Sequence, residues 1–160
     1  MHGNAIAKVI EKKPVKIVRE LPDGVKNWAP PGGSMVVSSP REVNELMALV
    51  PLGQVITLDE LRDALATRHG TSIACPVSTA IFINIAAQAA QDWQAMGRDD
   101  TIAWWRTLKS GGALNERYPG GTDAQAAKLE SEGHVIVTKG RKRLVDGYES
   151  ALFDLSAALD

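Results

Sequence analysis

The sequence predicts a mainly α-helical fold with one small β hairpin, arranged as a winged helix-turn-helix-like domain. Two segments with helical spacing of apolar residues are separated by the short link TSIA, as in a helix-turn-helix. A hairpin with Lys139–Gly140 at its turn is predicted near the end of the chain, where a winged helical domain carries its wing. We place this domain at residues 39–160 and an N-terminal arm or linker at residues 1–38.

The N-terminal arm has poor periodicity and carries the breaker cluster NWAPPGGS, which is typical of a linker or an irregular loop. Trp28 stands in this cluster and is expected to pin the arm onto the main domain. The domain then opens with a helix for which Ser39 is a good N-cap, Pro40 suits the first turn and Glu42 completes a capping-box pattern. This helix has one apolar face, made of Val43, Leu46, Met47 and Val50.

The helix-turn-helix follows. Thr57 and Glu60 form a second capping-box pattern in front of LDELRDALATRH, and Gly70 ends that helix. The next helix opens at Cys75 and Pro76 and runs through VSTAIFINIAAQAAQDWQAM, in the place of a recognition helix.

Further along the chain, TIAWWRTLKSGG is expected to be an exposed strand or loop. The segment GGTDAQAAKLESEGH is a predicted helix, capped by Thr122 or Asp123 and ended by Gly133. The hairpin HVIVTKGRKRLV comes next, and YESALFDLSAAL is a predicted amphipathic helix at the end.

Composition limits the function classes. No apolar run approaches the roughly 18 residues of a membrane span, and the first residues do not form a secretory signal. The lone cysteine, Cys75, excludes an internal disulfide and is typical of a reducing compartment. The three histidines are scattered without the spacing of metal ligands. These features predict a cytoplasmic protein without a metal or cofactor.

Charge is unevenly distributed along the chain. The formal net charge is −1, but residues 101–145 hold eight basic and four acidic residues, so this segment carries +4 and the rest carries −5. A basic face on the C-terminal half is the usual footprint of a polyanion binder. The alternative is that KGRKR is only a solvated hairpin.

Four segments together resemble the DNA-binding domain of O6-alkylguanine-DNA alkyltransferases, and more closely their non-enzymatic branch, the alkyltransferase-like proteins. The four segments, in the family's order and with similar spacing over about residues 40–138, are VPLGQVITLDELRDAL, ACPVSTAI, IAWWRTLKSGG and YPGGTDAQAAKLESEGH. The resemblance implies a non-enzymatic protein that binds double-stranded DNA through its minor groove. It also implies recognition of O6-alkylguanine by base flipping, and marking of the lesion for excision-repair proteins.

Trp104 stands where the alkyltransferases have the cysteine that accepts the alkyl group. An indole is not such a nucleophile, so alkyl transfer to this position is excluded. The resemblance implies that Trp104 lines or floors a base pocket and that Arg106 supports its loop. Cys75 lies at a helix N-terminus, where a thiol pKa is lowered, but no base adjoins it in sequence. We therefore interpret Cys75 as a small packing residue.

The sequence departs from the family pattern at three of its DNA-contacting or active-site positions. The arginine that fills the gap left by a flipped base aligns with Cys75, and the tyrosine that presses on the target phosphate aligns with Leu58. The histidine after the acceptor cysteine is Trp105, which we expect to pack under the loop. Arg41 and Arg68 are possible substitutes for the missing arginine.

Two further positions follow the family. Asn84 matches its hinge asparagine, and Glu132 matches its relay glutamate and is expected to brace the loop. The hydroxyls of Thr57, Ser78 and Thr79 suit either phosphate contacts or ordinary caps. The residues expected at the DNA or lesion surface are Thr57, Leu58, Cys75, Pro76, Val77, Ser78, Thr79, Asn84, Trp104, Trp105, Arg106 and Ser110.

A second interpretation stays open. The missing arginine and tyrosine, the net charge of −1 and the N-terminal arm also fit a winged helical module that binds protein or generic DNA and has a degenerate pocket. In that case Trp104 and Trp105 belong to an apolar partner surface.

Overall fold

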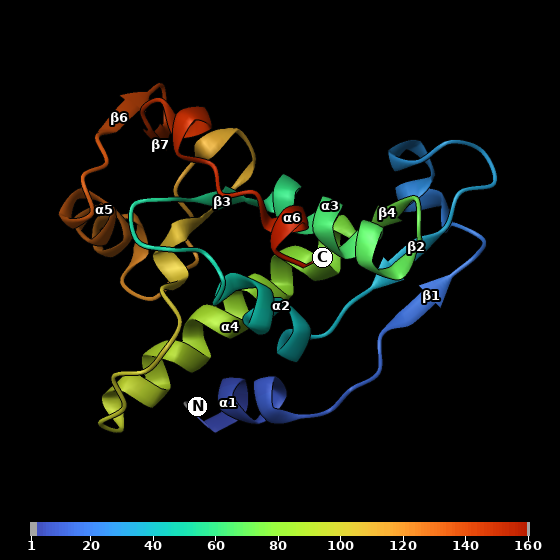
Figure 1. Ribbon diagram of the computed structural model, residues 1–160, viewed down its shortest axis with the longest axis horizontal. Helices are drawn as coiled ribbons and strands as arrows, with labels where there is room; N and C mark the ends of the chain where they lie inside the picture. The colour runs from blue at the N-terminus through green and yellow to red at the C-terminus, as the bar shows by residue number, and fades with distance from the viewer. Residues whose placement is uncertain (1–2, 160) are drawn as a thin grey trace.

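The computed structural model describes residues 3–159 and confirms a mainly α-helical fold with a small hairpin (Figure 1). The helices are α1 (Gly3–Ile10), α2 (Pro40–Met47), α3 (Leu58–His69), α4 (Pro76–Ala95), α5 (Gly121–Ser131) and α6 (Leu155–Ala158). The strands are β1 (Lys16–Val18), β2 (Met35–Val37), β3 (Ile56–Thr57), β4 (Ile73–Ala74), β5 (Thr107–Leu108), β6 (Ile136–Lys139) and β7 (Lys142–Val145). Short 3-10 turns are η1 (Asp23–Trp28), η2 (Trp104–Arg106), η3 (Ser110–Gly112) and η4 (Tyr148–Ala151).

The predicted helix-turn-helix is α3 and α4. The capping box at the start of α3 makes both of its bonds: the Thr57 hydroxyl accepts from the Asp59 amide, and the Glu60 carboxylate accepts from the Thr57 amide at 2.7 Å. Gly70 ends α3 in the left-handed conformation with φ 68°, which a glycine adopts without strain. Cys75 is the N-cap of α4. The local signals in the sequence therefore place the boundaries of both helices.

The start of α2 differs from the prediction in one bond. The Ser39 side chain accepts from the Glu42 amide as an N-cap should. The Glu42 carboxylate does not return to the cap, however. It accepts from the Ser38 hydroxyl at 2.5 Å and meets His69 Nε2 at 2.8 Å. Glu42 therefore joins α2 to the end of α3, because a buried carboxylate is better satisfied by two side-chain partners than by one amide.

The N-terminal arm is built into the fold. Helix α1 packs on α4 through Ala5, Val9 and Ala89. Strand β1 pairs antiparallel with β2, and β2 pairs parallel with β4, which directly precedes α4. The two strands of the arm have only three residues each, which is too short to show an alternation of apolar and polar residues. The sequence therefore predicts an irregular segment there.

Two predicted helix features are wrong. No side chain caps α5: Gly120, with φ 79°, precedes it, and the Thr122 and Asp123 side chains instead accept hydrogen bonds from Arg143 of β7. The expected helix at the C-terminal end is split into η4 and α6. There the Phe153 amide donates to the Val55 carbonyl, and the Val55 amide donates to the Ala151 carbonyl. These long-range backbone bonds replace the helical ones.

Figure 1 shows the hairpin β6–β7 on one side of the molecule and the strands β1, β2 and β4 on the opposite side, with α4 between them. The segment predicted as an exposed strand or loop is exposed only in part: Trp104, Thr107 and Leu108 are buried, whereas residues 109–111 are exposed. Strand β5 pairs parallel with β3 and thereby fixes this segment next to the start of α3. Among the helices of residues 3–159, none combines the length and apolar character that a membrane span requires.

Candidate nucleic-acid interface

A pocket of about 850 Å³ lies where α4, the loop after β5 and the hairpin meet. One wall is apolar and comes mainly from the first turns of α4 and the start of α3. Its residues are Leu58, Val77, Ala80 and Ile81. The opposite rim carries the cations Lys109, Arg117, Arg141, Lys142 and Arg143. The sequence-predicted residues Leu58, Val77, Asn84 and Ser110 are thus brought together in one place.

The recognition helix leaves an apolar face open. Val77 is 63% exposed and Ile81 is 51% exposed, and both line the pocket one helical turn apart. Leu58 is partly buried and packs against the main core. An exposed apolar surface in a concave site suits the binding of a ring or an alkyl group.

The loop that closes the pocket is fastened to α4 by a pair of amides. Asn115 Nδ2 donates to Asn84 Oδ1 at 2.9 Å, and the Arg117 amide donates to Asn115 Oδ1 at 3.0 Å. Asn84 therefore links the recognition helix to the pocket loop, although a long stretch of sequence separates them.

Gln125 of α5 was not predicted from the sequence. Its side chain is fully buried; Oε1 accepts from the Asn115 amide at 2.7 Å, and Nε2 donates to the Trp105 carbonyl at 3.1 Å. One amide side chain thus ties the pocket loop to the turn that holds the two tryptophans. The sequence gives no signal for it beyond a polar residue on an otherwise small, apolar helix face.

Tyr118 is the aromatic residue in the pocket lining, and most of its side chain is covered by protein. It is only 3% exposed and its hydroxyl donates to the Thr107 carbonyl at 2.7 Å. Burial raises the pKa of Tyr118 far above its usual value, so the phenol is neutral and remains a donor at physiological pH.

Trp104 lies behind this wall and does not line the pocket, contrary to the sequence-based expectation. It is 4% exposed, and its ring meets Tyr118 edge-on at 5.2 Å and Trp105 edge-on at 5.6 Å. The indole belongs to the main core. The reason is physical: a large apolar ring gains more free energy from full burial than from a half-open wall.

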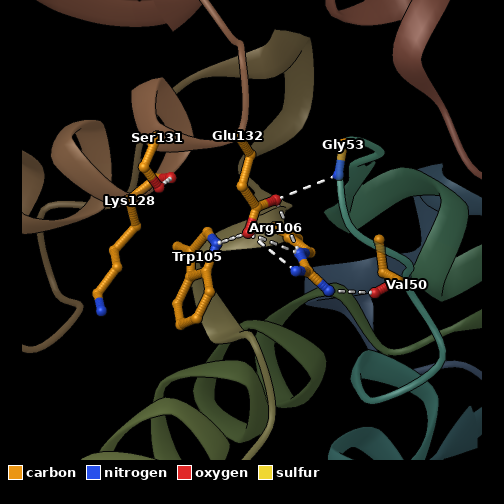
Figure 2. Close-up of polar contacts among 7 residues, drawn as sticks. All are labelled: Val50, Gly53, Trp105, Arg106, Lys128, Ser131 and Glu132. Atoms are coloured by element: carbon orange, nitrogen blue, oxygen red, sulfur yellow. Dashed lines mark hydrogen bonds and ion pairs between the residues drawn. The ribbon is translucent and has the colours of Figure 1, made fainter.

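Trp105 and Arg106 converge on Glu132 (Figure 2). The Arg106 guanidinium donates to Glu132 Oε2 at 2.8 Å and to the Val50 carbonyl at 2.8 Å. Trp105 Nε1 donates to Glu132 Oε2 at 2.8 Å, and the Gly53 amide donates to Oε1 at 3.3 Å. Burial alone would raise the pKa of the Glu132 carboxyl, but the hydrogen bonds from Arg106, Trp105 and Gly53 outweigh it. The pKa therefore lies below its ordinary value, and the carboxylate is charged.

The hydroxyls of Thr57 and Thr79, for which the sequence left phosphate contacts and ordinary caps both open, are bonded within the protein. Thr57 is 1% exposed and its hydroxyl donates to Glu60, while Thr79 is 1% exposed and its hydroxyl donates to the Cys75 carbonyl at 2.6 Å. Neither hydroxyl faces outward, because a buried hydroxyl must find a protein partner. The buried Ser78 hydroxyl has no such partner among residues 3–159.

Five other residues that the sequence analysis singled out each have their own contacts in the structure. Ser110 donates to the Asp59 carboxylate at 2.8 Å and so joins the pocket loop to α3. Pro76 is the first residue of α4 and is half-buried. Cys75 accepts from the Ser78 amide at 3.5 Å as an N-cap and lies outside the pocket lining. Arg41 and Arg68 lie elsewhere: Arg41 donates to the Ile10 carbonyl, and Arg68 pairs with Glu42 at 3.5 Å. Neither arginine replaces the missing wedge at the pocket.

The cations of the hairpin are not equivalent. Arg143 pairs with Asp123 at 2.6 Å, and Lys109 of the loop pairs with Glu116 at 3.2 Å. Lys139, Arg141 and Lys142 are exposed and make no ion pair within the described part of the chain. Within residues 3–159, no group of three His, Cys, Asp or Glu side chains could hold a metal ion.

No protein-family profile and no curated protein matches the chain. Two solved structures are similar to it. One is the S. pombe protein Atl1 in complex with damaged DNA containing O6-carboxymethylguanine; it is 22% identical, covers 71% of this chain and 93% of its own, and has a TM-score of 0.46. The other is S. pombe ATL in complex with DNA, with the same identity and coverage and a TM-score of 0.44. Both belong to the alkyltransferase-like proteins, the family that the four sequence segments resemble.

Proposed function

We propose that this chain is a non-enzymatic DNA-binding protein of the alkyltransferase-like type, which receives an extruded O6-alkylguanine base in the pocket beside α4. Its ligand is double-stranded DNA, and the bound complex marks the damaged site for excision-repair proteins. The observation that carries the proposal is the position of the pocket, which lies between a recognition helix and a cationic hairpin.

The chemistry of the walls supports a flipped base as the occupant. The open apolar face of Val77 and Ile81 complements the flat base and its alkyl group, and Tyr118 supplies an aromatic edge. The amides of Asn84 and Asn115 lie in the same wall and provide hydrogen-bonding groups for a base edge. An alkylated guanine is neutral, so apolar side chains and amide groups suit it better than a charged side chain does.

The charges support DNA as the carrier of that base. Lys139, Arg141 and Lys142 project from the hairpin, and Arg141 and Lys142 also line the pocket rim. A duplex entering along α4 would bring its phosphates to these cations, which bind a backbone without reading its sequence.

The positions of Trp104 and Cys75 indicate that the base is bound without transfer of its alkyl group. Trp104 replaces the acceptor cysteine and is buried behind Tyr118. The only thiol, that of Cys75, caps α4 outside the pocket lining. No thiol among the pocket-lining residues can therefore attack an alkyl group held in the pocket.

The test is a binding titration at two salt concentrations. A duplex with one O6-methylguanine is compared with the same duplex containing guanine, with tryptophan fluorescence as the readout. We expect tighter binding to the lesion, and a loss of that preference in Ile81→Trp, which narrows the pocket at its apolar wall. Val135→Trp is the matched control, because Val135 is also an exposed apolar residue, at 60%, and lies outside the pocket lining.

The second candidate is a winged helical module whose pocket has lost its lesion selectivity. The exposure of Val77 and Ile81 on the recognition helix favours it, since an apolar face there also suits a protein partner. Equal, salt-sensitive affinity for both duplexes would identify a generic DNA binder. Absence of any DNA binding would identify a protein-interaction module.

A further inference from the structure

Trp28 is unusually exposed for a tryptophan. It ends the η1 turn of the N-terminal arm, and 53% of its surface is accessible, whereas Trp104 is 4% exposed. Large aromatic side chains are normally mostly buried in a folded domain. The Arg62 guanidinium of α3 lies over its ring, with Cζ 4.7 Å from the ring centroid, so one face of the indole is held in a fixed position.

This pair lies at the start of the recognition helix. Arg62 Nε donates to the Ala74 carbonyl at 3.1 Å, and Ala74 is followed by Cys75, the N-cap of α4. Ala29, the neighbour of Trp28, packs in the same apolar cluster as Cys75. In Figure 1 the segment between β1 and β2 lies on the outer side of β2 and β4. Through Arg62 and Ala29, Trp28 is thus linked to the segment that leads into α4, which contains Cys75, the position at which the sequence lacks the arginine that fills the gap left by a flipped base.

The N-terminal arm carries a net positive charge. Residues 3–38 contain six basic side chains and three acidic ones, which leaves +3. Lys12, Lys13, Lys16 and Arg19 are exposed and make no ion pair within residues 3–159. Strand β1, which carries Lys16, is two strands away from β4, a separation of about 10 Å. A duplex that meets the start of α4 therefore has unpaired cations within reach of its backbone.

We propose that Trp28, supported by Arg62, stacks on a duplex base next to the flipped nucleotide and holds the gap open in place of an arginine wedge. The inference rests on the proposed DNA-binding function and adds a contact from outside the helix-turn-helix. Apolar side chains that enter between base steps stabilise an opened duplex, and an indole stacks on any base through its flat face. The Arg62 guanidinium over the Trp28 ring adds a positive charge that attracts the phosphate backbone.

The test uses the full chain and the same two duplexes. Trp28→Ala should lower affinity for the O6-methylguanine duplex about 5- to 100-fold, the range of one base–aromatic stack, and Trp28→Phe should keep most of the affinity. Trp93→Ala is the matched control, since Trp93 also has an arginine over its ring, Arg98 at 4.8 Å, but sits near the far end of α4. Circular dichroism and the unfolding midpoint establish that each variant is folded.

The outcomes separate this inference from the proposed function. If the parent prefers the lesion and Trp28→Ala binds as the parent does, the Trp28 contact is wrong and the pocket stands. If the parent shows no preference but Trp28→Ala still weakens DNA binding while Trp93→Ala does not, the contact stands and the lesion pocket is wrong. A protein that binds neither duplex overturns both.

Discussion

Glu132 and Arg106, which are 26 residues apart in sequence, form a largely buried two-bond ion pair, with their closest atoms 2.8 Å apart. The carboxylate also holds the Trp105 indole, and the guanidinium also holds the Val50 carbonyl (Figure 2). The pair therefore joins α5, the tryptophan turn and the segment after α2. This joint fixes the turn that holds the two tryptophans, and none of its residues lines the pocket.

Removing one member of this pair should destabilise the protein strongly. Arg106→Met leaves the Glu132 charge buried with fewer donors, and we expect the free energy of unfolding to fall by about 3–5 kcal/mol. Urea unfolding measures the change. Arg98→Met is the control, because Arg98 pairs with Asp100 on the surface and its loss should change stability far less. Equal effects of the two substitutions would contradict a buried brace.

The Glu132 carboxylate should make the stability of the protein depend on pH, and the direction of its pKa shift fixes the sign. Its pKa in the folded protein is lower than the ordinary 4.5, so its contribution to stability is fully present above that value. The contribution is lost as the pH falls through the folded-state pKa. We expect the stability difference between the parent and Glu132→Gln to be largest near neutral pH and to shrink in acid. A difference that grows in acid would show that the carboxylate is not held as an anion.

Gln125 should control the shape of the pocket through its two backbone contacts. Gln125→Met keeps the volume but leaves the Asn115 amide and the Trp105 carbonyl without their partner, at a cost of about 1–3 kcal/mol for each buried group. We expect lower stability together with a reduced preference for the alkylated duplex, measured as the ratio of the two affinities. A variant that loses stability but keeps the full ratio would assign Gln125 to folding alone.

Trp104 should act on the lesion through Tyr118. Trp104→Ala opens a core cavity and is expected to cost about 3–5 kcal/mol of stability. Trp104→Phe keeps an aromatic ring behind Tyr118 and should retain lesion preference. Tyr118→Ala, by contrast, removes a side chain that lines the pocket and should weaken lesion binding by about 1–3 kcal/mol. The reverse order, with Trp104→Phe the more damaging for binding, would show that the indole itself touches the base.

The hairpin cations should determine affinity but not selectivity. Replacing Lys139, Arg141 and Lys142 with alanine is expected to lower the slope of log affinity against log salt by about 0.9 for each lost phosphate contact. Both duplexes should be affected equally, so their affinity ratio should stay constant. Lys8→Ala is the control on the distant α1 helix. An unchanged slope would mean that the hairpin is only a solvated turn.

The sequence alone determined the parts of the fold that depend on neighbours within a few residues. Ser39, the Thr57–Glu60 box and Pro76 mark the starts of three helices, Gly70 marks the end of one of them, and Lys139–Gly140 forms the hairpin turn. Each of these signals works through bonds or backbone preferences that are complete within one turn of chain. This is why the helix-turn-helix and the hairpin could be predicted without a structure.

The tertiary structure decided which side chains face the pocket. Trp104 and Trp28 are both tryptophans beside irregular segments, yet the first is buried behind Tyr118 and the second is exposed under Arg62. Gln125 meets Asn115 and Trp105 only because α5, the pocket loop and the tryptophan turn are folded against one another. Burial and long-range hydrogen bonds depend on every element that packs around a residue, and local spacing carries no record of those elements.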